Sequence, residues 1–128
     1  MKEKLIELHK NSHSPYSNYA VSCVLVMNDG VEFNGVNVEN ASYGAGICAE
    51  RSAIVSAVSA GYKKGQFKEL NVMVSSGEIG WPCFVCRQVI TEFFEKSAIV
   101  RAWATTGEYI EHTVEELCPY PFDSEDLK

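Results

Sequence analysis

The spacing of apolar residues along the chain predicts an alternation of helices and strands. Between residues 2 and 12, Leu5, Ile6 and Leu8 lie on or near one helical face. The segment from 19 to 27 (YAVSCVLVM) is instead rich in β-branched and aliphatic residues, which favours a buried strand. Applied to the whole chain, these patterns predict helices over residues 2–12, 48–60 and 83–95 and strands over 19–27, 31–36, 69–75, 98–104 and 108–112.

Turn and capping residues mark the ends of these segments. The Asn-Asp-Gly run at 28–30 supplies the turn of a hairpin between the first two strands. Residues 37–47 are polar and contain glycine, which predicts a loop. Thr113 and Glu116 have the spacing of a capping box, which predicts a short helix after the last strand. The tail after Pro119 is too polar to fold independently.

The order of the elements predicts the fold class. After the hairpin come a helix, a strand, a second helix, another strand and a fifth strand, so the later strands are joined by helical crossovers. Such crossovers are right-handed and pack helices against the sheet. We therefore predict an α/β protein, a three-layer α/β/α sandwich with helices on both faces of a mixed five-stranded sheet. No repeat or linker divides the chain, and residues 1–128 are expected to form one domain.

Charge and hydropathy exclude several classes of partner. The chain has 11 Lys and Arg against 17 Asp and Glu, a net charge of -6 at pH 7. Binding to a polynucleotide requires a basic surface, so no nucleic-acid partner is expected. No apolar run approaches the ~18 residues of a membrane-spanning helix, and the charged N-terminus is unlike a secretory signal. We therefore expect no membrane association and a cytoplasmic protein with a small-molecule substrate.

The five cysteines are expected to be reduced. An odd number of cysteines without a signal peptide argues against a disulfide framework. Metal binding, catalysis or burial must then explain each thiol. Cys23 lies in the apolar run of the first strand, so we expect it to be a small buried hydrophobic residue.

Two short motifs place the other chemistry at predicted helix starts. They are CAE at 48–50 and PCFVC at 82–86. Unpaired backbone N–H groups and the helix dipole favour a thiolate at such a start, and residues three apart share one helix face. Three thiolates leave one position of a tetrahedral zinc open, which is typical of a catalytic rather than a structural site.

Glu50 and Arg51 follow the first of these cysteines. Glu50 is two residues after Cys48, roughly 200° around a regular helix, but in the first turn it can reach toward the open metal position. Arg51, on the cysteine side, can offset the thiolate charge by hydrogen bonding. Simpler interpretations exist, because a C-x-x-C pair is often structural or redox-active and a glutamate is favourable in any first helical turn. The combination of C-x-E with P-C-x-x-C is what matches the three-cysteine variant of the zinc deaminase motif.

Over nearly its whole length the chain resembles the cytidine deaminases of the small, homotetrameric, three-cysteine zinc type. The matching segments are PYSNYAV at 15–21, NGVNVENASYGAGICAERSA at 34–53, PCFVCRQVI at 82–90 and PFDSEDL at 121–127. The resemblance implies Zn²⁺ as the cofactor, with Cys48, Cys83 and Cys86 as its ligands. It also implies that Glu50 carries protons between the attacking water, the base and the departing ammonia.

The resemblance further implies residues that bind the nucleoside. A ribose-binding pair falls on Asn37 and Glu39, whose side chains point the same way if the segment is extended. From the residues alone, this pair would be interpreted as ordinary turn polarity. Tyr19 falls where the family has a base-stacking aromatic, usually phenylalanine. Phe122 matches a tail aromatic that reaches a neighbouring subunit's site, which implies a homotetramer whose active sites are completed by neighbouring subunits.

Large residues beside the metal ligands depart from the family pattern. The family usually has S-P-C-G-A-C where this chain has Trp81, Phe84 and Val85 around the same proline and cysteines. The ligands and Glu50 are intact, so the zinc chemistry is not affected. The large side chains can narrow the pocket, shift the substrate preference or repack an interface.

Three functions therefore remain open. The first is zinc-dependent hydrolysis of cytidine and deoxycytidine to uridine and deoxyuridine with release of ammonia, as in pyrimidine salvage. The second is the same chemistry on a modified cytosine nucleoside or a cytosine-bearing antibiotic, which the large residues motivate. The third is a non-catalytic, zinc-stabilised interaction protein. Retention of Glu50, Asn37 and Glu39 weighs against the third, because a scaffold requires none of them.

Overall fold

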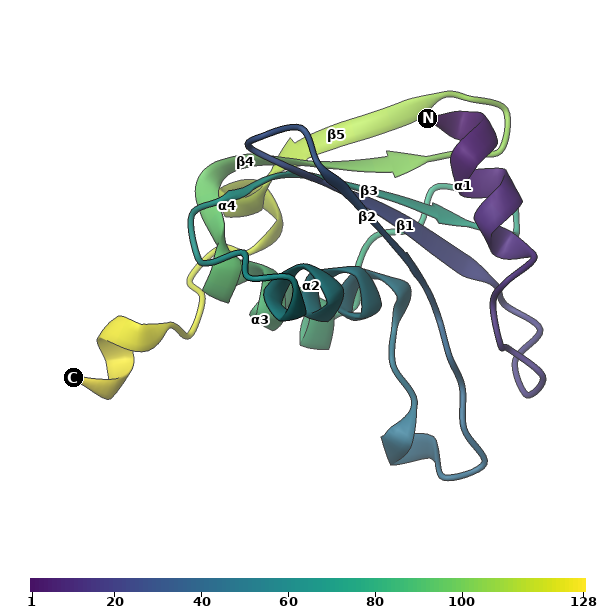
Figure 1. The fold of residues 1–128 in the computed structure, drawn as a ribbon, viewed down its shortest axis with the longest axis horizontal. Coiled ribbons are helices and arrows are strands. Elements are labelled where there is room, and N and C mark those ends of the chain that lie inside the picture. The colour runs from purple at the N-terminus through teal and green to yellow at the C-terminus, as the bar shows by residue number, and fades with distance from the viewer.

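Five strands form one mixed sheet in the order β2-β1-β3-β4-β5 (Figure 1). In the computed structural model, which describes all of residues 1–128, strand β1 runs antiparallel to both β2 and β3. Strands β3 and β4 are parallel, and β5 returns antiparallel to β4. The strands are β1 (Val21–Met27), β2 (Glu32–Val36), β3 (Phe67–Val74), β4 (Phe94–Trp103) and β5 (Tyr109–Thr113). The predicted mixed five-stranded sheet is confirmed.

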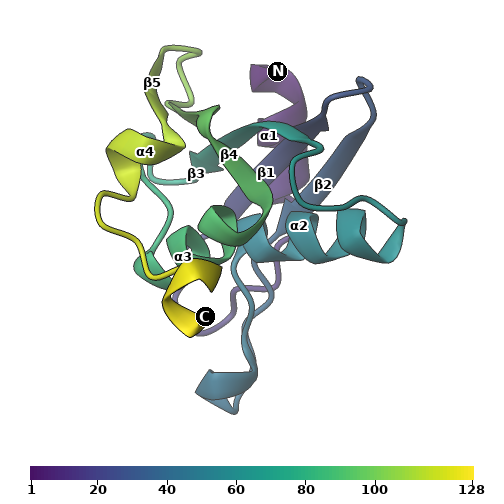
Figure 2. The same ribbon diagram turned by 90° about the vertical axis from the view of Figure 1, so that its left-hand side faces the viewer.

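Helices cover both faces of the sheet, which confirms the predicted three-layer α/β/α sandwich. Helix α2 (Ala49–Ser59) connects β2 to β3, and α3 (Phe84–Phe93) connects β3 to β4. Both connections move across the sheet in the same direction, and crossovers of one hand that do so place their helices on the same face. Figure 2 shows α2 and α3 side by side below the sheet. The short helix α4 (Val114–Leu117) joins this layer, because Val114 belongs to the same buried cluster.

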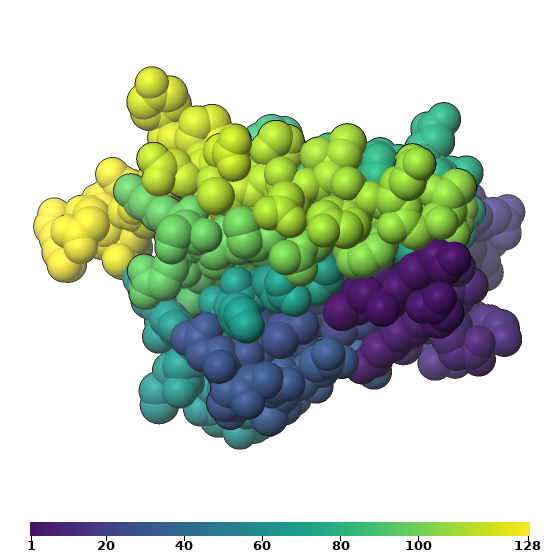
Figure 3. All heavy atoms as spheres, turned by 90° about the horizontal axis from the view of Figure 1, so that it is seen from above, coloured from purple at the N-terminus to yellow at the C-terminus, as the bar shows by residue number.

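The opposite face carries only α1 (Lys2–His9). Leu5 of this helix is fully buried against Val24 and Met73, which point away from α2 and α3. Seen from above, α1 covers one corner of this face, and atoms of the strands reach the surface beside it (Figure 3). No helix of the structure combines the length and the apolar character needed to cross a bilayer.

The main core lies between the sheet and the layer that contains α2 and α3. It is a cluster of 15 buried residues that includes Leu25, Ile54 and Ile90, and Cys23 is part of it with no exposed surface, as predicted. Gly35 allows α2 to approach β2 closely, because a Cβ atom at this position would lie 2.2 Å from the carbonyl oxygen of Ala49. Helix α2 is therefore seated directly on the backbone of β2.

Some predicted boundaries are wrong. The first helix ends at His9 rather than at residue 12, and β4 begins at Phe94, which the sequence places inside the preceding helix. Phe94 fits the apolar face of α3, but its pairing with Phe67 of β3 starts a strand at once, with no loop between. The tail ends in a 3₁₀ helix, η2 (Ser124–Leu127), which projects from the body in Figure 1.

Candidate metal and active site

The starts of α2 and α3 meet beside the sheet, and each start is a cysteine. Cys48 is the N-cap of α2 with φ -76° and ψ 158°, and Cys83 is the N-cap of α3 with φ -66° and ψ 167°. Both residues are therefore extended, and each thiol leaves the helix rather than following its surface. This geometry removes the 200° separation expected between Cys48 and Glu50 on a regular helix.

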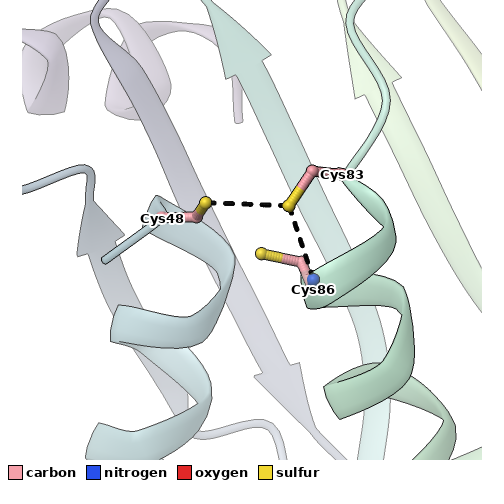
Figure 4. Close-up of side chains that lie close together, drawn as sticks. All are labelled: Cys48, Cys83 and Cys86. Atoms are coloured by element: carbon pink, nitrogen blue, oxygen red, sulfur yellow. Dashed lines mark hydrogen bonds between the residues drawn. The ribbon is translucent and has the colours of Figure 1, made fainter. Parts of the chain in front are cut away.

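Three thiols converge at this point. The sulfur atoms of Cys48, Cys83 and Cys86 lie within 4.8 Å of one another and face the same small volume (Figure 4). The Sγ atoms of Cys48 and Cys83 are 3.8 Å apart. Zn–S bonds of about 2.3 Å at tetrahedral angles separate two sulfurs by about 3.8 Å. The donor set and its spacing thus fit a zinc ion with three thiolate ligands and a fourth position free for another group.

Arg51 helps to keep the thiol of Cys48 deprotonated, as a metal ligand must be. Its Nη2 atom donates a hydrogen bond of 3.4 Å to the Sγ atom of Cys48. Hydrogen bonding from Cys86, together with that from Arg51, lowers the pKa of Cys48 to about 5. The pKa of Cys86 is raised by the same interaction and by burial. The Nε atom of Arg51 is buried without a hydrogen-bond partner, so the hydrogen bonding of the guanidinium is directed at the thiols.

Glu50 is an acid–base group in a dry environment. It is the second residue of α2 and is only 4% exposed. Burial, with a smaller contribution from the charge of Cys48, raises the pKa of Glu50 to about 7. A carboxyl group with a pKa near neutrality is well suited both to accept and to donate a proton.

One cavity connects the thiols to the other predicted residues. It has a volume of about 630 Å³, a size typical of small-molecule sites. The predicted site residues on its lining are Tyr19, Asn37, Glu39, Cys48, Glu50, Arg51 and Cys83. Residues from four separate segments of the chain thus meet around a single pocket.

Asn37 and Glu39 are oriented by hydrogen bonds to neighbouring residues of the cavity wall, and each can form further hydrogen bonds to a ligand. The Oδ1 atom of Asn37 accepts hydrogen bonds from Ser12 and from the backbone of Val21, while its Nδ2 atom donates to the carbonyl of Tyr19. An amide nitrogen has two N–H groups, so one donor of Asn37 remains free. Glu39 accepts two backbone N–H groups on Oε1 and the hydroxyl of Ser17 on Oε2. These bonds hold the pKa of Glu39 below its ordinary value, so the group is a carboxylate.

The remaining predicted residues occupy different places. Phe122 is 56% exposed and lies outside this cavity, in the tail that projects from the body. Trp81 lines the cavity, but its ring also packs at a tilt against His112 of β5, with a centroid distance of 5.1 Å. Phe84 and Val85 are exposed and do not line the cavity. Of the three large residues, only Trp81 can act on the pocket directly.

Sequence reasoning missed residues at the mouth of the cavity. Ser17 lines it and orients Glu39 through its hydroxyl, and the rings of Tyr16 and Tyr43 meet edge to face at 6.3 Å. The available signal was aromatic residues placed in polar loops, where an exposed ring has no local structural reason. The loops that contain residues 16–19 and 37–47 therefore contribute much of the cavity lining.

Fold and site together define a class of protein. A three-layer α/β/α sandwich that arranges three thiols and a buried carboxyl group around one cavity has the parts of a zinc-dependent hydrolase.

Known proteins resemble this chain in sequence and in structure. Residues 1–105 match the family model for the cytidine and deoxycytidylate deaminase zinc-binding region. A cytidine deaminase of Sporosarcina psychrophila is 39% identical, over 98% of this chain and 93% of its own. One of Halalkalibacterium halodurans is 35% identical with the same coverage. The crystal structure of a cytidine deaminase from Burkholderia pseudomallei superimposes with a TM-score of 0.88 at 38% identity and covers 94% of both chains. The chain therefore belongs to the cytidine and deoxycytidylate deaminase family.

Proposed function

We propose that this chain hydrolyses cytidine and deoxycytidine to uridine and deoxyuridine and releases ammonia, with zinc held by Cys48, Cys83 and Cys86. The observation that carries the proposal is the cluster of three sulfur atoms within 4.8 Å, next to a carboxyl group that is 4% exposed. A structural zinc site would use a fourth protein ligand. No fourth Cys, His, Asp or Glu joins this cluster, so one position is free for water.

Glu50 moves the protons of the reaction. Cys48, Cys83 and Cys86 would hold the zinc ion, which would supply the Lewis acidity that makes a water molecule acidic near neutral pH. Glu50 accepts the proton from this water as its oxygen adds to C4 of the cytosine ring, and then delivers the proton to N3. Glu50 then takes the proton of the hydroxyl now on C4 and delivers it to the exocyclic nitrogen; the C4–N bond breaks, the C4 carbonyl forms, and ammonia leaves. Water and the nucleoside are thereby converted to uridine and ammonia, and Glu50 returns to its starting state.

Asn37 and Glu39, on the cavity lining, support a nucleoside rather than a free base as the substrate. The free N–H of Asn37 and the remaining lone pairs of the Glu39 carboxylate provide one donor and one acceptor. Such a pair suits neighbouring hydroxyl groups of a ribose. Tyr19 is 44% exposed and lines the same cavity, where its ring supplies an apolar surface for the base.

A homotetramer with shared active sites is the assembly that we propose. Phe122 and Tyr120 are exposed on a projecting tail, and aromatic side chains in such a position gain from burial against another subunit. The nitrogen of the Gln88 side chain donates a hydrogen bond of 2.7 Å to the carbonyl of Phe122, which keeps the tail close to α3. Sedimentation analysis is expected to show a tetramer. We also place the activity in pyrimidine salvage in the cytoplasm.

A modified cytosine nucleoside is the second candidate substrate, and Trp81 is the observation that favours it. This large side chain lies on the cavity wall beside Cys83, where a smaller residue would leave more room. A panel of cytosine nucleosides with ring substituents, assayed by ammonia release, separates the two substrates. Turnover of cytidine alone would dismiss the second.

The decisive experiment follows the loss of cytidine absorbance as uridine forms, with and without zinc. Glu50→Ala is expected to retain zinc and to lose activity by several orders of magnitude, because the proton carrier is gone. Cys86→Ala is expected to lose the metal itself. Near-full activity of Glu50→Ala, or full zinc occupancy in Cys86→Ala, would contradict the assignment. Wild-type protein with bound zinc and no activity on any cytosine nucleoside would favour the non-catalytic alternative.

A further inference from the structure

The three thiols of the site are held in place by different means. Cys86 has no exposed surface, so the core around it fixes its orientation. Cys48 accepts a hydrogen bond from Arg51, three residues along the same helix. Cys83, by contrast, is an exposed residue, and its Sγ atom accepts a hydrogen bond of 3.5 Å from the backbone N–H of Cys86 within its own helical turn. The direction of its Cα–Cβ bond, and hence the place from which the sulfur reaches the cluster, depends on the peptide groups on both sides of its Cα atom.

Arg87 contacts both of these peptide groups. Its backbone N–H donates to the carbonyl of Cys83 at 2.9 Å, as in any helical turn. In addition, its side-chain Nε donates to the carbonyl of Pro82 at 2.8 Å. These two carbonyls belong to the peptide units that precede and follow Cys83. One residue thus restrains φ and ψ of Cys83 together.

The guanidinium of Arg87 is itself anchored to another part of the chain. Its Nη1 atom donates to the carbonyl of Leu117 at 3.0 Å, which is the last residue of α4. The last carbonyls of a helix have no partner within the helix, so this hydrogen bond satisfies a free acceptor. Arg87 therefore ties the turn before Cys83 to a segment thirty residues further along the chain.

The ring of Phe84 packs against the guanidinium of Arg87. The Cζ atom of Arg87 lies 4.5 Å from the centre of the Phe84 ring, in the geometry of a cation–π contact. Phe84 is 77% exposed and does not line the cavity, so the pocket gives no reason for a large side chain here. A ring over the guanidinium limits the access of water to its hydrogen bonds and restricts its rotamers.

We infer that Arg87 is a positioning residue that fixes the direction of the Cys83 thiol, and that Phe84 supports it in this role. The inference rests on the proposed role of Cys83 as a zinc ligand. Groups that orient metal ligands from outside the coordination sphere typically contribute 10–100-fold to metal affinity. Loss of the Arg87 side chain should therefore weaken zinc retention much more than it weakens the fold.

The test compares Arg87→Ala with Arg101→Ala. Arg101 is a matched control, because it is also a partly buried arginine with two partners, Glu69 and Glu111. It points away from α2 and α3, since its neighbours in β4, Val100 and Ala102, face the main core. Zinc release from the purified, zinc-loaded proteins is followed with an excess of a coloured chelator. We expect release from Arg87→Ala to be roughly 10–100-fold faster than from the wild type, and release from Arg101→Ala to be within about twofold of it. Equal release from folded Arg87→Ala and wild type would overturn the inference.

A second measurement needs neither zinc nor turnover. In the metal-free proteins, the rate at which a small disulfide reagent modifies Cys83 is measured by mass spectrometry of the labelled peptide. A thiol whose backbone is no longer restrained is expected to react several-fold faster in Arg87→Ala, while Cys23 stays protected. Unchanged reactivity of Cys83 would also contradict the inference.

Milder variants cover the case in which Arg87→Ala does not fold. Arg87→Lys keeps the charge but cannot reach both carbonyls with a planar fork, and Phe84→Ala keeps Arg87 and removes its cover. Both are expected to release zinc several-fold faster than the wild type and to lower kcat more than they change KM, because the cavity wall at Asn37 and Glu39 is untouched. Wild-type zinc release in both would refute the proposed role. Failure of the wild type to bind zinc would instead refute the proposed function.

Discussion

Replacement of Gly35 by alanine tests how closely the start of α2 is set against the sheet. The added Cβ atom would lie 2.2 Å from the carbonyl oxygen of Ala49 and 2.7 Å from the backbone nitrogen of Ala53. Non-bonded heavy atoms prefer separations of about 3.5–4.0 Å, so the shortfall exceeds about 1 Å. Both obstacles are backbone atoms, which cannot move aside by changing rotamer. The first turn of α2 must therefore shift away from β2.

The size of the effect follows from this geometry. Overpacking of a well-filled core costs about 1–3 kcal/mol, and a backbone obstacle places Gly35→Ala at the upper end, about 3 kcal/mol. The displaced turn carries Cys48 and Glu50 with it. A misplacement of about 1 Å at reacting groups costs on the order of 100-fold in rate. We expect both losses in the same variant.

Urea denaturation and the rate of cytidine deamination measure the two losses. Gly44→Ala is the matched control, because a Cβ atom there meets nothing within 4 Å. It is expected to stay within about 0.5 kcal/mol of the wild type, as for a surface change with no special contact. If Gly35→Ala had the stability and activity of Gly44→Ala, the reasoning on the seating of α2 would be wrong.

Three further predictions concern stability. Hydrogen bonds from the backbone and hydroxyl of Thr113 lower the pKa of Glu116 in the folded state. This carboxylate therefore stabilises the fold at a pH above its unfolded-state pKa. The stabilisation is lost as the pH falls through its folded-state pKa. The gap in unfolding free energy between wild type and Glu116→Gln should therefore close on acidification from pH 7, and a gap independent of pH in urea titrations would contradict this. Asn71 is fully buried, accepts a hydrogen bond of 3.0 Å from the indole N–H of Trp103 and donates one to the carbonyl of Val24. Asn71→Ala should therefore lower the free energy of unfolding by about 1–3 kcal/mol. A loss below about 0.5 kcal/mol in urea denaturation would contradict this. Removal of zinc with a chelator should lower Tm without abolishing cooperative unfolding, and added zinc should restore it; a Tm insensitive to chelator would count against a metal held by the folded state.

The sequence was sufficient for the order of the elements and for the sheet. Apolar periodicity and turn residues give five strands and three main helices, and the crossovers require helices against the sheet. The unequal covering of the two faces could not be read from local pattern, because it depends on the direction in which both crossovers move. The start of β4 could not be read either, because Phe94 fits a helix locally and only its pairing with Phe67 makes it a strand.

The site was predictable where its residues are close in sequence. The spacing of Cys83 and Cys86 and the position of Cys48 at a helix start predict the cluster of sulfur atoms that the structure contains. The contact of Arg87 with Leu117 was not predictable, because it joins two segments that no local pattern relates. Binding of substrate by Phe122 stays a prediction, since it depends on a second subunit.

The topology also bears on when, during synthesis and folding, the thiol cluster can assemble. Cys48 and Cys83 are 35 residues apart, and they meet because α2 and α3 lie side by side on the sheet. At a synthesis rate of about 5–20 residues per second, the first thiol waits roughly 2–7 seconds for the second to be made. The 15-residue core contains its own apolar contacts, so the sheet can form without a metal, unlike a zinc finger. The three thiols therefore come together only in the folded chain, and we expect zinc to bind after the scaffold has formed.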